Sequence, residues 1–73
     1  MRNYKVIFVK GDKKDSYTMF SIVGFSLSLA ELIREGCSIL NICAVDNEIV
    51  SALTKKEENK INFFLSTEGI KIA

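Results

Sequence analysis

The sequence predicts an α+β domain in which an antiparallel sheet of four to five strands packs against one short helix and a second, longer one. Three observations predict this class. Aromatic and β-branched residues alternate over 3–9 and 16–23 on either side of a polar segment, which is typical of a β-hairpin. Two Ser/Thr–Glu pairs three positions apart indicate helix starts. The length of 73 residues fits a single domain that spans 1–73.

The hairpin is the first predicted element. Residues 3–9 place apolar groups on both faces of the strand, so this strand is expected to be central or covered on both sides. Residues 11–15 are polar and contain a glycine, which makes them the turn. Residues 16–23 then return as the second strand. Because the connection is short, antiparallel pairing is the simplest arrangement.

A short helix is predicted over residues 28–35. Ser28 and Glu31 form a capping-box pattern, in which the hydroxyl and the carboxylate satisfy free backbone N–H groups. Gly36 supplies the C-terminal stop. The apolar residues within the segment follow helical spacing: Leu29, Leu32 and Ile33. A helix of two turns is not stable alone, so we expect it to lie on the sheet.

Two further strands are predicted after this helix. Residues 37–45 are apolar on both faces, as in the interior of a sheet, and Ile42 lies in the middle of this strand. Asp46 and Asn47 tolerate positive φ and form a two-residue turn. Residues 48–53 return as the fourth strand.

The C-terminal part of the chain fits two structures. Thr54 and Glu57 form a second capping-box pattern that favours a helix over 55–67, and the apolar residues for one helical face are Ile61, Phe64 and Leu65. An alternating pattern fits a strand and hairpin instead: Ile61, Phe63 and Leu65. Residues 65–72 resemble 32–39 in layout, since a glycine follows a helix end in both. This similarity supports the helix.

Residues for chemistry are scarce. The chain has no histidine, which is the commonest general base near neutral pH and the commonest transition-metal ligand. Cys37 and Cys43 lie too far apart on one strand or helix for a disulfide, and two sulfurs alone do not form a zinc site. The four glycines are isolated, so no phosphate-binding loop is present. We expect a non-enzymatic protein with no catalytic residues, no metal and no cofactor.

The cellular location follows from the cysteines and from the hydropathy pattern. Free cysteines that serve as small buried residues fit a reducing compartment, so the protein is expected to be cytoplasmic. The longest uncharged run, residues 16–30, is shorter and more polar than a membrane-spanning helix requires. We expect no membrane partner.

The large share of apolar residues is the most informative feature for function. Hydrophobic residues make up 48% of the chain, and one short helix cannot cover both faces of the sheet. Either the C-terminal segment covers the second face or another protein does. We expect an interaction module or regulator that forms a homodimer or docks on a larger protein through apolar sheet surface or an open strand edge. Its composition resembles that of small bacterial or phage accessory proteins. Candidate interface anchors are Phe20, Phe25 and Phe63.

An alternative function is nucleic-acid binding. The chain has two lysine clusters, and acidic residues are interleaved with the lysines in both. The first consists of Lys10, Lys13 and Lys14, and the second consists of Lys55, Lys56 and Lys60. The formal net charge is only +1, whereas dedicated nucleic-acid binders concentrate a basic excess on one face. This alternative therefore requires that the two clusters share a face.

Overall fold

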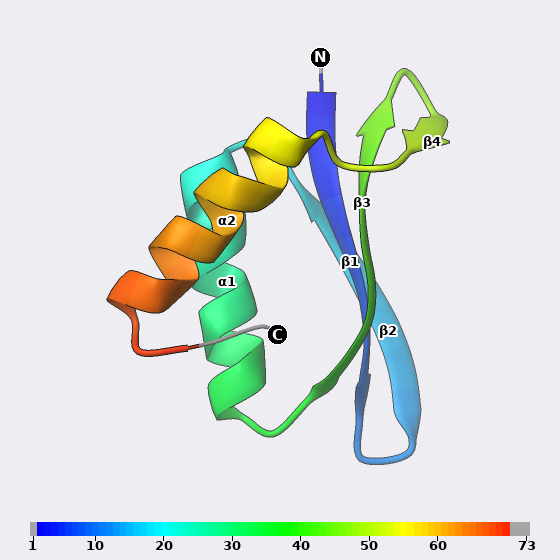
Figure 1. Ribbon diagram of the computed structural model, residues 1–73. Coiled ribbons are helices and arrows are strands. Elements are labelled where there is room, and N and C mark those ends of the chain that lie inside the picture. Colours follow the sequence, from blue (N-terminus) through cyan, green and yellow to red (C-terminus); the bar gives the residue numbers. More distant parts are fainter. Residues whose placement is uncertain (1, 71–73) are drawn as a thin grey trace.

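Four strands and two helices make up residues 2–70, which the computed structural model describes (Figure 1). Their order and bounds are β1 (Arg2–Lys10), β2 (Lys13–Met19), α1 (Ile22–Arg34), β3 (Ser38–Asp46), β4 (Ile49–Ser51) and α2 (Lys55–Thr67). The strands form one antiparallel sheet in the order β2-β1-β3-β4. The predicted α+β class, with an antiparallel sheet and two helices, is confirmed.

The first hairpin is tighter than the sequence predicts. Its turn consists only of Gly11 and Asp12, and Lys13 already pairs with Lys10. Gly11 has a φ of 65°, a conformation that glycine adopts without steric cost and that suits a two-residue hairpin. The second strand therefore occupies residues 13–19, and the prediction of 16–23 placed it too late.

The first helix starts six residues earlier than predicted. Ser21 is its N-cap and accepts a hydrogen bond from the Gly24 N–H at 3.2 Å. Ser28 is therefore inside α1 and caps nothing; its hydroxyl donates to the Met19 Sδ at 3.2 Å. The start of this segment is rich in residues that favour strands. Helical spacing nevertheless buries three large side chains in one row, Phe25, Leu29 and Leu32. This burial outweighs the local strand propensity.

The second hairpin differs from the prediction by one residue. Its turn is Asn47-Glu48, with φ values of 49° and 69°, so both residues adopt the left-handed conformation that two-residue hairpins favour. The fourth strand is only three residues long, against the predicted 48–53. The pairing of β1 with β3 also shifts register between Ile7 and Phe8.

The C-terminal segment is helical from 55 to 67, as the capping box predicts. Thr54 Oγ1 accepts from the Glu57 N–H at 3.2 Å, and the Glu57 carboxylate accepts from the Thr54 N–H at 2.9 Å. The helix prevails over the alternative hairpin because it buries two residues that are four positions apart on one face, Ile61 and Leu65.

Both helices end with the same arrangement of backbone hydrogen bonds. The Cys37 N–H donates to the Leu32 carbonyl and the Ile70 N–H donates to the Leu65 carbonyl, each at 3.0 Å. The intervening glycines have positive φ, 84° at Gly36 and 76° at Gly69. These are Schellman C-caps, and they account for the resemblance between 32–39 and 65–72. A strand after Gly69 would fall on residues 71–73, which lie outside the described part of the chain.

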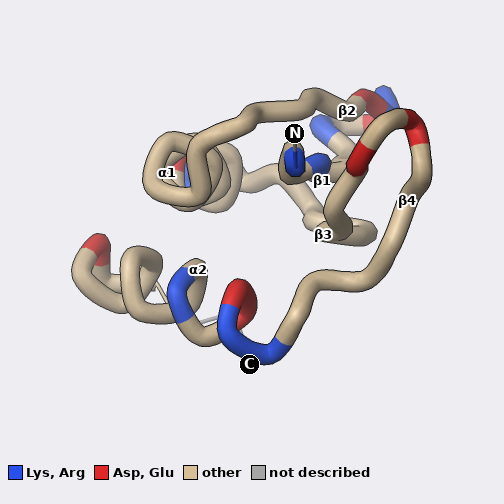
Figure 2. The backbone as a smooth tube through the Cα atoms, turned by 90° about the horizontal axis from the view of Figure 1, so that it is seen from above, with Lys and Arg blue, Asp and Glu red and all other residues tan. Residues whose placement is uncertain are grey.

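The two helices lie on the same face of the sheet (Figures 1 and 2). The core between the layers contains Val6, Phe25, Leu29, Ile61 and Leu65. Because α2 packs mainly against α1, it adds to the helical layer and leaves the opposite face of the sheet without a helix. Helix α2 therefore does not wrap the sheet.

Candidate interaction surface

Four exposed apolar side chains lie at the start of α1 and on α2. Phe20 is 72% exposed, Val23 43%, Leu27 46% and Phe63 63%. Single exposed apolar residues are common on soluble proteins, but a group of large ones is not. Val23 and Phe63 line one cavity, whereas Phe20 precedes α1 and is not among the residues that line this cavity. We call Val23, Leu27, Phe63 and this cavity the helical apolar surface.

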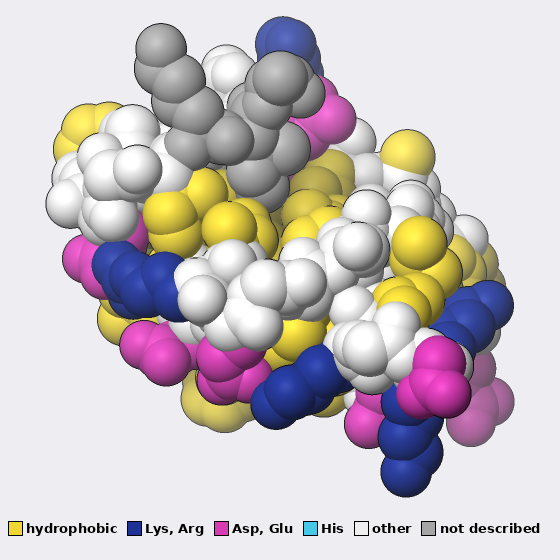
Figure 3. All heavy atoms as spheres, turned by 90° about the horizontal axis from the view of Figure 1, so that it is seen from below, with side chains coloured by type: hydrophobic (Ala, Val, Ile, Leu, Met, Phe, Trp, Pro, Cys, Tyr) yellow, Lys and Arg dark blue, Asp and Glu magenta, His cyan; other side chains and the backbone are white. Residues whose placement is uncertain are grey.

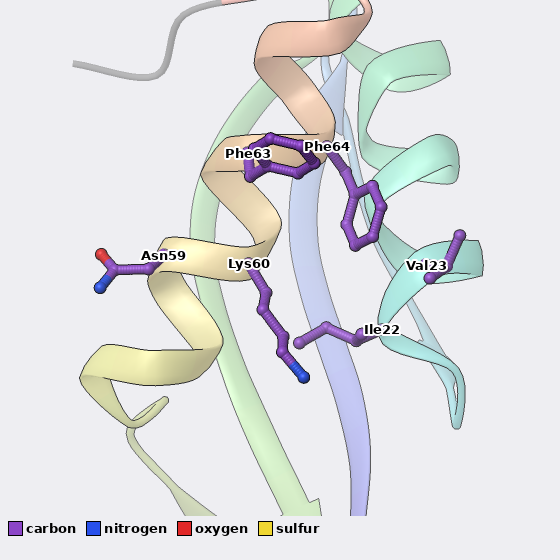
Figure 4. Close-up of a pocket in the computed structure, with 6 residues that line it drawn as sticks. All are labelled: Ile22, Val23, Asn59, Lys60, Phe63 and Phe64. Atoms are coloured by element: carbon purple, nitrogen blue, oxygen red, sulfur yellow. The ribbon is translucent and has the colours of Figure 1, made fainter.

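A cavity of about 410 Å³ opens between α1 and α2 within this surface (Figure 4). The Phe64 ring points from α2 toward α1, the Lys60 side chain extends toward Ile22, and Asn59 points away from the cavity. The Phe63 and Phe64 rings meet edge to face, with centroids 5.6 Å apart and planes at 72°. This contact fixes the exposed Phe63 ring against the half-buried Phe64 ring.

The outward stripe of α1 changes from apolar to charged along the helix. Val23 and Leu27 occupy its first half, and Glu31 and Arg34 continue the same spacing in its second half. Arg34 pairs with Glu31 at 3.6 Å and with Glu68 at 2.8 Å. A fully solvated helix carries polar residues along its whole outer stripe. The apolar half is therefore the part of α1 that is suited to contact another molecule.

A double ion pair holds α2 in its place beside this surface. The Arg2 Nε and Nη2 atoms donate to the two Glu57 carboxylate oxygens, both at 2.7 Å. Arg2 holds the pKa of Glu57 well below its usual range, with further lowering from the Thr54 N–H and the Tyr4 hydroxyl, while burial acts in the opposite direction. Since Arg2 belongs to β1, this pair fixes the first turn of α2 to the central strand.

The three predicted anchors differ in their exposure to solvent. Phe20 and Phe63 are both exposed, and Phe63 lines the cavity of the helical apolar surface, whereas Phe20 lies between β2 and α1. Phe25 is completely buried, with its ring centroid 5.8 Å from that of Tyr4 and 6.5 Å from that of Tyr17. It is a core residue, so we remove it from the candidate anchors.

The two lysine clusters lie at opposite ends of the molecule. Lys10, Lys13 and Lys14 surround the β1–β2 turn, whereas the cluster of Lys55, Lys56 and Lys60 lies at the start of α2 (Figure 1). Lys10 also pairs with Glu35 at 3.0 Å. Seen from the end that carries the turn, cationic and anionic side chains alternate (Figure 3). The structure thus forms no single basic face from the two clusters.

Sequence reasoning missed Ile22, Val23, Leu27 and Phe64 as members of this surface. The first two were assigned to a strand because the helix was placed six residues too late. A signal was nevertheless present, because the helical spacing of Leu29 and Leu32 continues backward to Phe25.

Within residues 2–70, no group of three metal-ligating side chains is arranged to hold an ion, and both cysteines are buried and unpaired with each other. No helix in this range is long and apolar enough to cross a membrane. No protein-family model, curated protein or solved structure matches the chain.

Proposed function

We infer that this protein is a non-enzymatic interaction module that binds an amphipathic helix of a larger protein on its helical apolar surface. The observation that supports this function best is the exposure of Val23 and Phe63 beside the apolar cavity that they line between two helices. Leaving the Phe63 ring in water loses the free energy that its burial would provide, and exposed apolar groups beside a cavity are typical of binding sites.

The shape of the surface favours a helical partner. A shallow groove between two helices receives the apolar stripe of a third helix, whose side chains at i, i+3 or i+4, and i+7 enter it. Lys60 is the charged residue among those that line the cavity, and Lys56 precedes it by one turn of α2. A partner helix with carboxylates beside its apolar stripe would complement this charge.

A display library of amphipathic helical peptides, with varied residues beside a fixed apolar stripe, tests the proposal. We expect the enriched peptides to carry Asp or Glu beside the stripe. Phe63→Ser should weaken their binding at least about tenfold, since a central aromatic anchor contributes that much or more. Leu40→Ser is the matched control, because Leu40 is an exposed apolar residue on β3.

Two results would contradict this function. One is a set of enriched peptides that bind the Phe63→Ser variant as tightly as the wild type. The other is a change of solution mass from dimer to monomer on Phe63→Ser, which would make a second copy the occupant of the surface. Melting curves of both variants must first show that they remain folded.

Salt dependence distinguishes nucleic-acid binding from the proposed binding of an apolar helix. Phosphate contacts weaken steeply as salt rises, whereas apolar contacts respond little. Fluorescence anisotropy with labelled single- and double-stranded DNA at low and high salt should show no specific binding. A salt-sensitive complex that disappears on combining Lys13→Glu with Lys56→Glu would favour the nucleic-acid function instead.

A further inference from the structure

The two edges of the sheet are built differently. At one edge, β4 is only three residues long and pairs with Ala44, Val45 and Asp46 alone, so residues 38–43 of β3 have no further strand beside them and the edge is interrupted where β4 ends. At the other edge, β2 runs for seven residues in unbroken register with β1, and the chain contains no proline. Five of the seven residues are exposed. The edge of β2 is thus long enough to pair with another strand.

The hairpin geometry determines which backbone groups of β2 face outward. The pair that flanks a two-residue turn, here Lys10 and Lys13, is hydrogen-bonded, and hydrogen-bonded and non-hydrogen-bonded pairs then alternate. The N–H and C=O groups that point away from β1 therefore belong to Lys14, Ser16 and Thr18. In agreement, the Ser16 N–H donates to the Asp15 Oδ1 at 2.8 Å.

We propose that β2 pairs with β2 of a second copy, antiparallel about a two-fold axis at Ser16, to form a continuous eight-stranded sheet. In this register, Ser16 lies opposite Ser16 of the second copy, and Lys14 lies opposite Thr18. All three outward residues of each strand then form hydrogen-bonded pairs, which gives six backbone hydrogen bonds. The homodimer expected from the composition is thereby assigned to a strand edge.

Other symmetric registers are worse, including those centred on a residue whose backbone faces β1. An axis at Asp15 places two carboxylates directly opposite each other. An axis at Tyr17 places Lys14 opposite Phe20, which lies outside β2, so only Ser16 and Thr18 form hydrogen-bonded pairs within the strands. An axis at Lys14 places two lysines directly opposite each other, which is unfavourable. An axis at Thr18 aligns Lys14 with Ile22, which is already in α1. With the axis at Ser16, the remaining pairs are Lys13 with Met19 and Asp15 with Tyr17, and no like charges face each other.

The exposed Phe20 ring fits this arrangement. Phe20 follows the last residue of β2, so in the Ser16 register it lies beside Asp12 and Lys13 of the second copy. The aliphatic part of a lysine side chain can cover an aromatic ring while its ammonium stays in water. Since a strand edge buries a small area, the dimer should be weak and should dissociate on dilution.

Asp15 regulates access to this edge. Its carboxylate must release the Ser16 N–H before the carbonyl of the second copy can accept that hydrogen. Asp15→Ala removes this competing acceptor. Because both copies contribute a Ser16 N–H, it should shift dimer dissociation to a concentration about 5- to 100-fold lower, the range that two hydrogen bonds give.

Light scattering over a dilution series tests the proposal. Ser16→Lys places two like charges face to face on the axis and should abolish the dimer. Asn41→Lys adds the same charge at an exposed position of β3, which β1 separates from β2, and should leave dissociation unchanged. A strict monomer for both wild type and Asp15→Ala, or a dimer that tolerates Ser16→Lys, would overturn the proposal.

Cross-linking tests the register itself. The Cα atoms of a hydrogen-bonded antiparallel pair are about 5.5 Å apart, which is within the range of a disulfide. Ser16→Cys should therefore form a disulfide-linked dimer under mild oxidation, and Asn41→Cys should not. The native Cys37 and Cys43 are buried. A dimer that responds to Phe63→Ser and not to Ser16→Lys would place the second copy on the helical apolar surface and refute the strand-edge interface.

Discussion

The Tyr17 hydroxyl is buried and has no hydrogen-bond partner among the described residues. Burial raises the pKa of Tyr17, because the phenolate is poorly solvated there, while the Ser28 hydroxyl, which donates its hydrogen to the Met19 Sδ, acts in the opposite direction. Leaving a buried polar group without a partner costs free energy, whereas an apolar group of the same shape does not. At the scale of single residues, this hydroxyl is a local source of instability.

Tyr17→Phe should therefore raise the free energy of unfolding, by up to about 1 kcal/mol, in urea denaturation. Tyr4→Phe is the matched control, because the Tyr4 hydroxyl interacts with Glu57 and its loss should destabilise the protein. Equal destabilisation by the two substitutions would show that the Tyr17 hydroxyl is satisfied.

Glu48 carries a second local cost, because a φ of 69° brings its side chain into conflict with the backbone. Glu48→Gly should stabilise the protein by up to about 1 kcal/mol, since Asn-Gly is a favoured pair for this turn type. Thermal unfolding measures this gain. Asn47→Gly should gain less, because asparagine already tolerates the left-handed conformation.

At the scale of elements, the start of α1 depends on Ser21 and not on Ser28. Ser21→Ala removes the acceptor of the Gly24 N–H and should cost about 1 kcal/mol. Ser28→Ala should cost less, because alanine favours a helix interior and partly offsets the loss of the contact with Met19. If denaturant unfolding showed a larger loss of stability for Ser28→Ala than for Ser21→Ala, the helix would start at Ser28, as the sequence predicted.

The attachment of α2 to β1 depends on pH through Glu57. Because its pKa is lower in the folded protein than the ordinary value of 4.5, the unfolded chain takes up a proton first as pH falls. The stabilisation is complete above the unfolded pKa and is lost progressively below about pH 5. Glu57→Gln should destabilise the protein at pH 7 and flatten the dependence of its melting temperature on pH between about 5 and 2. Equal acid sensitivity of variant and wild type would contradict this role.

At the scale of the whole molecule, two phenylalanines that look alike in the sequence have opposite roles. Phe25→Ala leaves a cavity in the core and should cost about 3–5 kcal/mol, a large part of the stability of a small domain. Phe63→Ala removes an exposed ring and should change stability by no more than about 0.5 kcal/mol. Denaturant unfolding of both variants measures the contrast, and a large loss at Phe63 would place it in the core.

Local signals predicted the elements that local hydrogen bonds define. The capping box of Thr54 and Glu57 sets the start of α2, and Gly36 and Gly69 end their helices in the left-handed conformation that glycine adopts without cost. The second capping pattern, Ser28 with Glu31, failed because the same residue types also occur inside helices. Nothing in the pattern itself distinguishes the two cases.

The sequence by itself determined the α+β class, the presence of two hairpins and the bounds that a C-terminal helix would have, because turn geometry, caps and periodicity act between residues close in the chain. The choice between this helix and the alternative hairpin came from the tertiary structure. Only the tertiary structure decided that α1 begins at Ile22 and that α2 joins α1 on one face of the sheet. Both depend on which side chains are buried together, and this is a property of packing between distant segments. For the same reason, periodicity could not separate the buried Phe25 from the exposed Phe20 and Phe63.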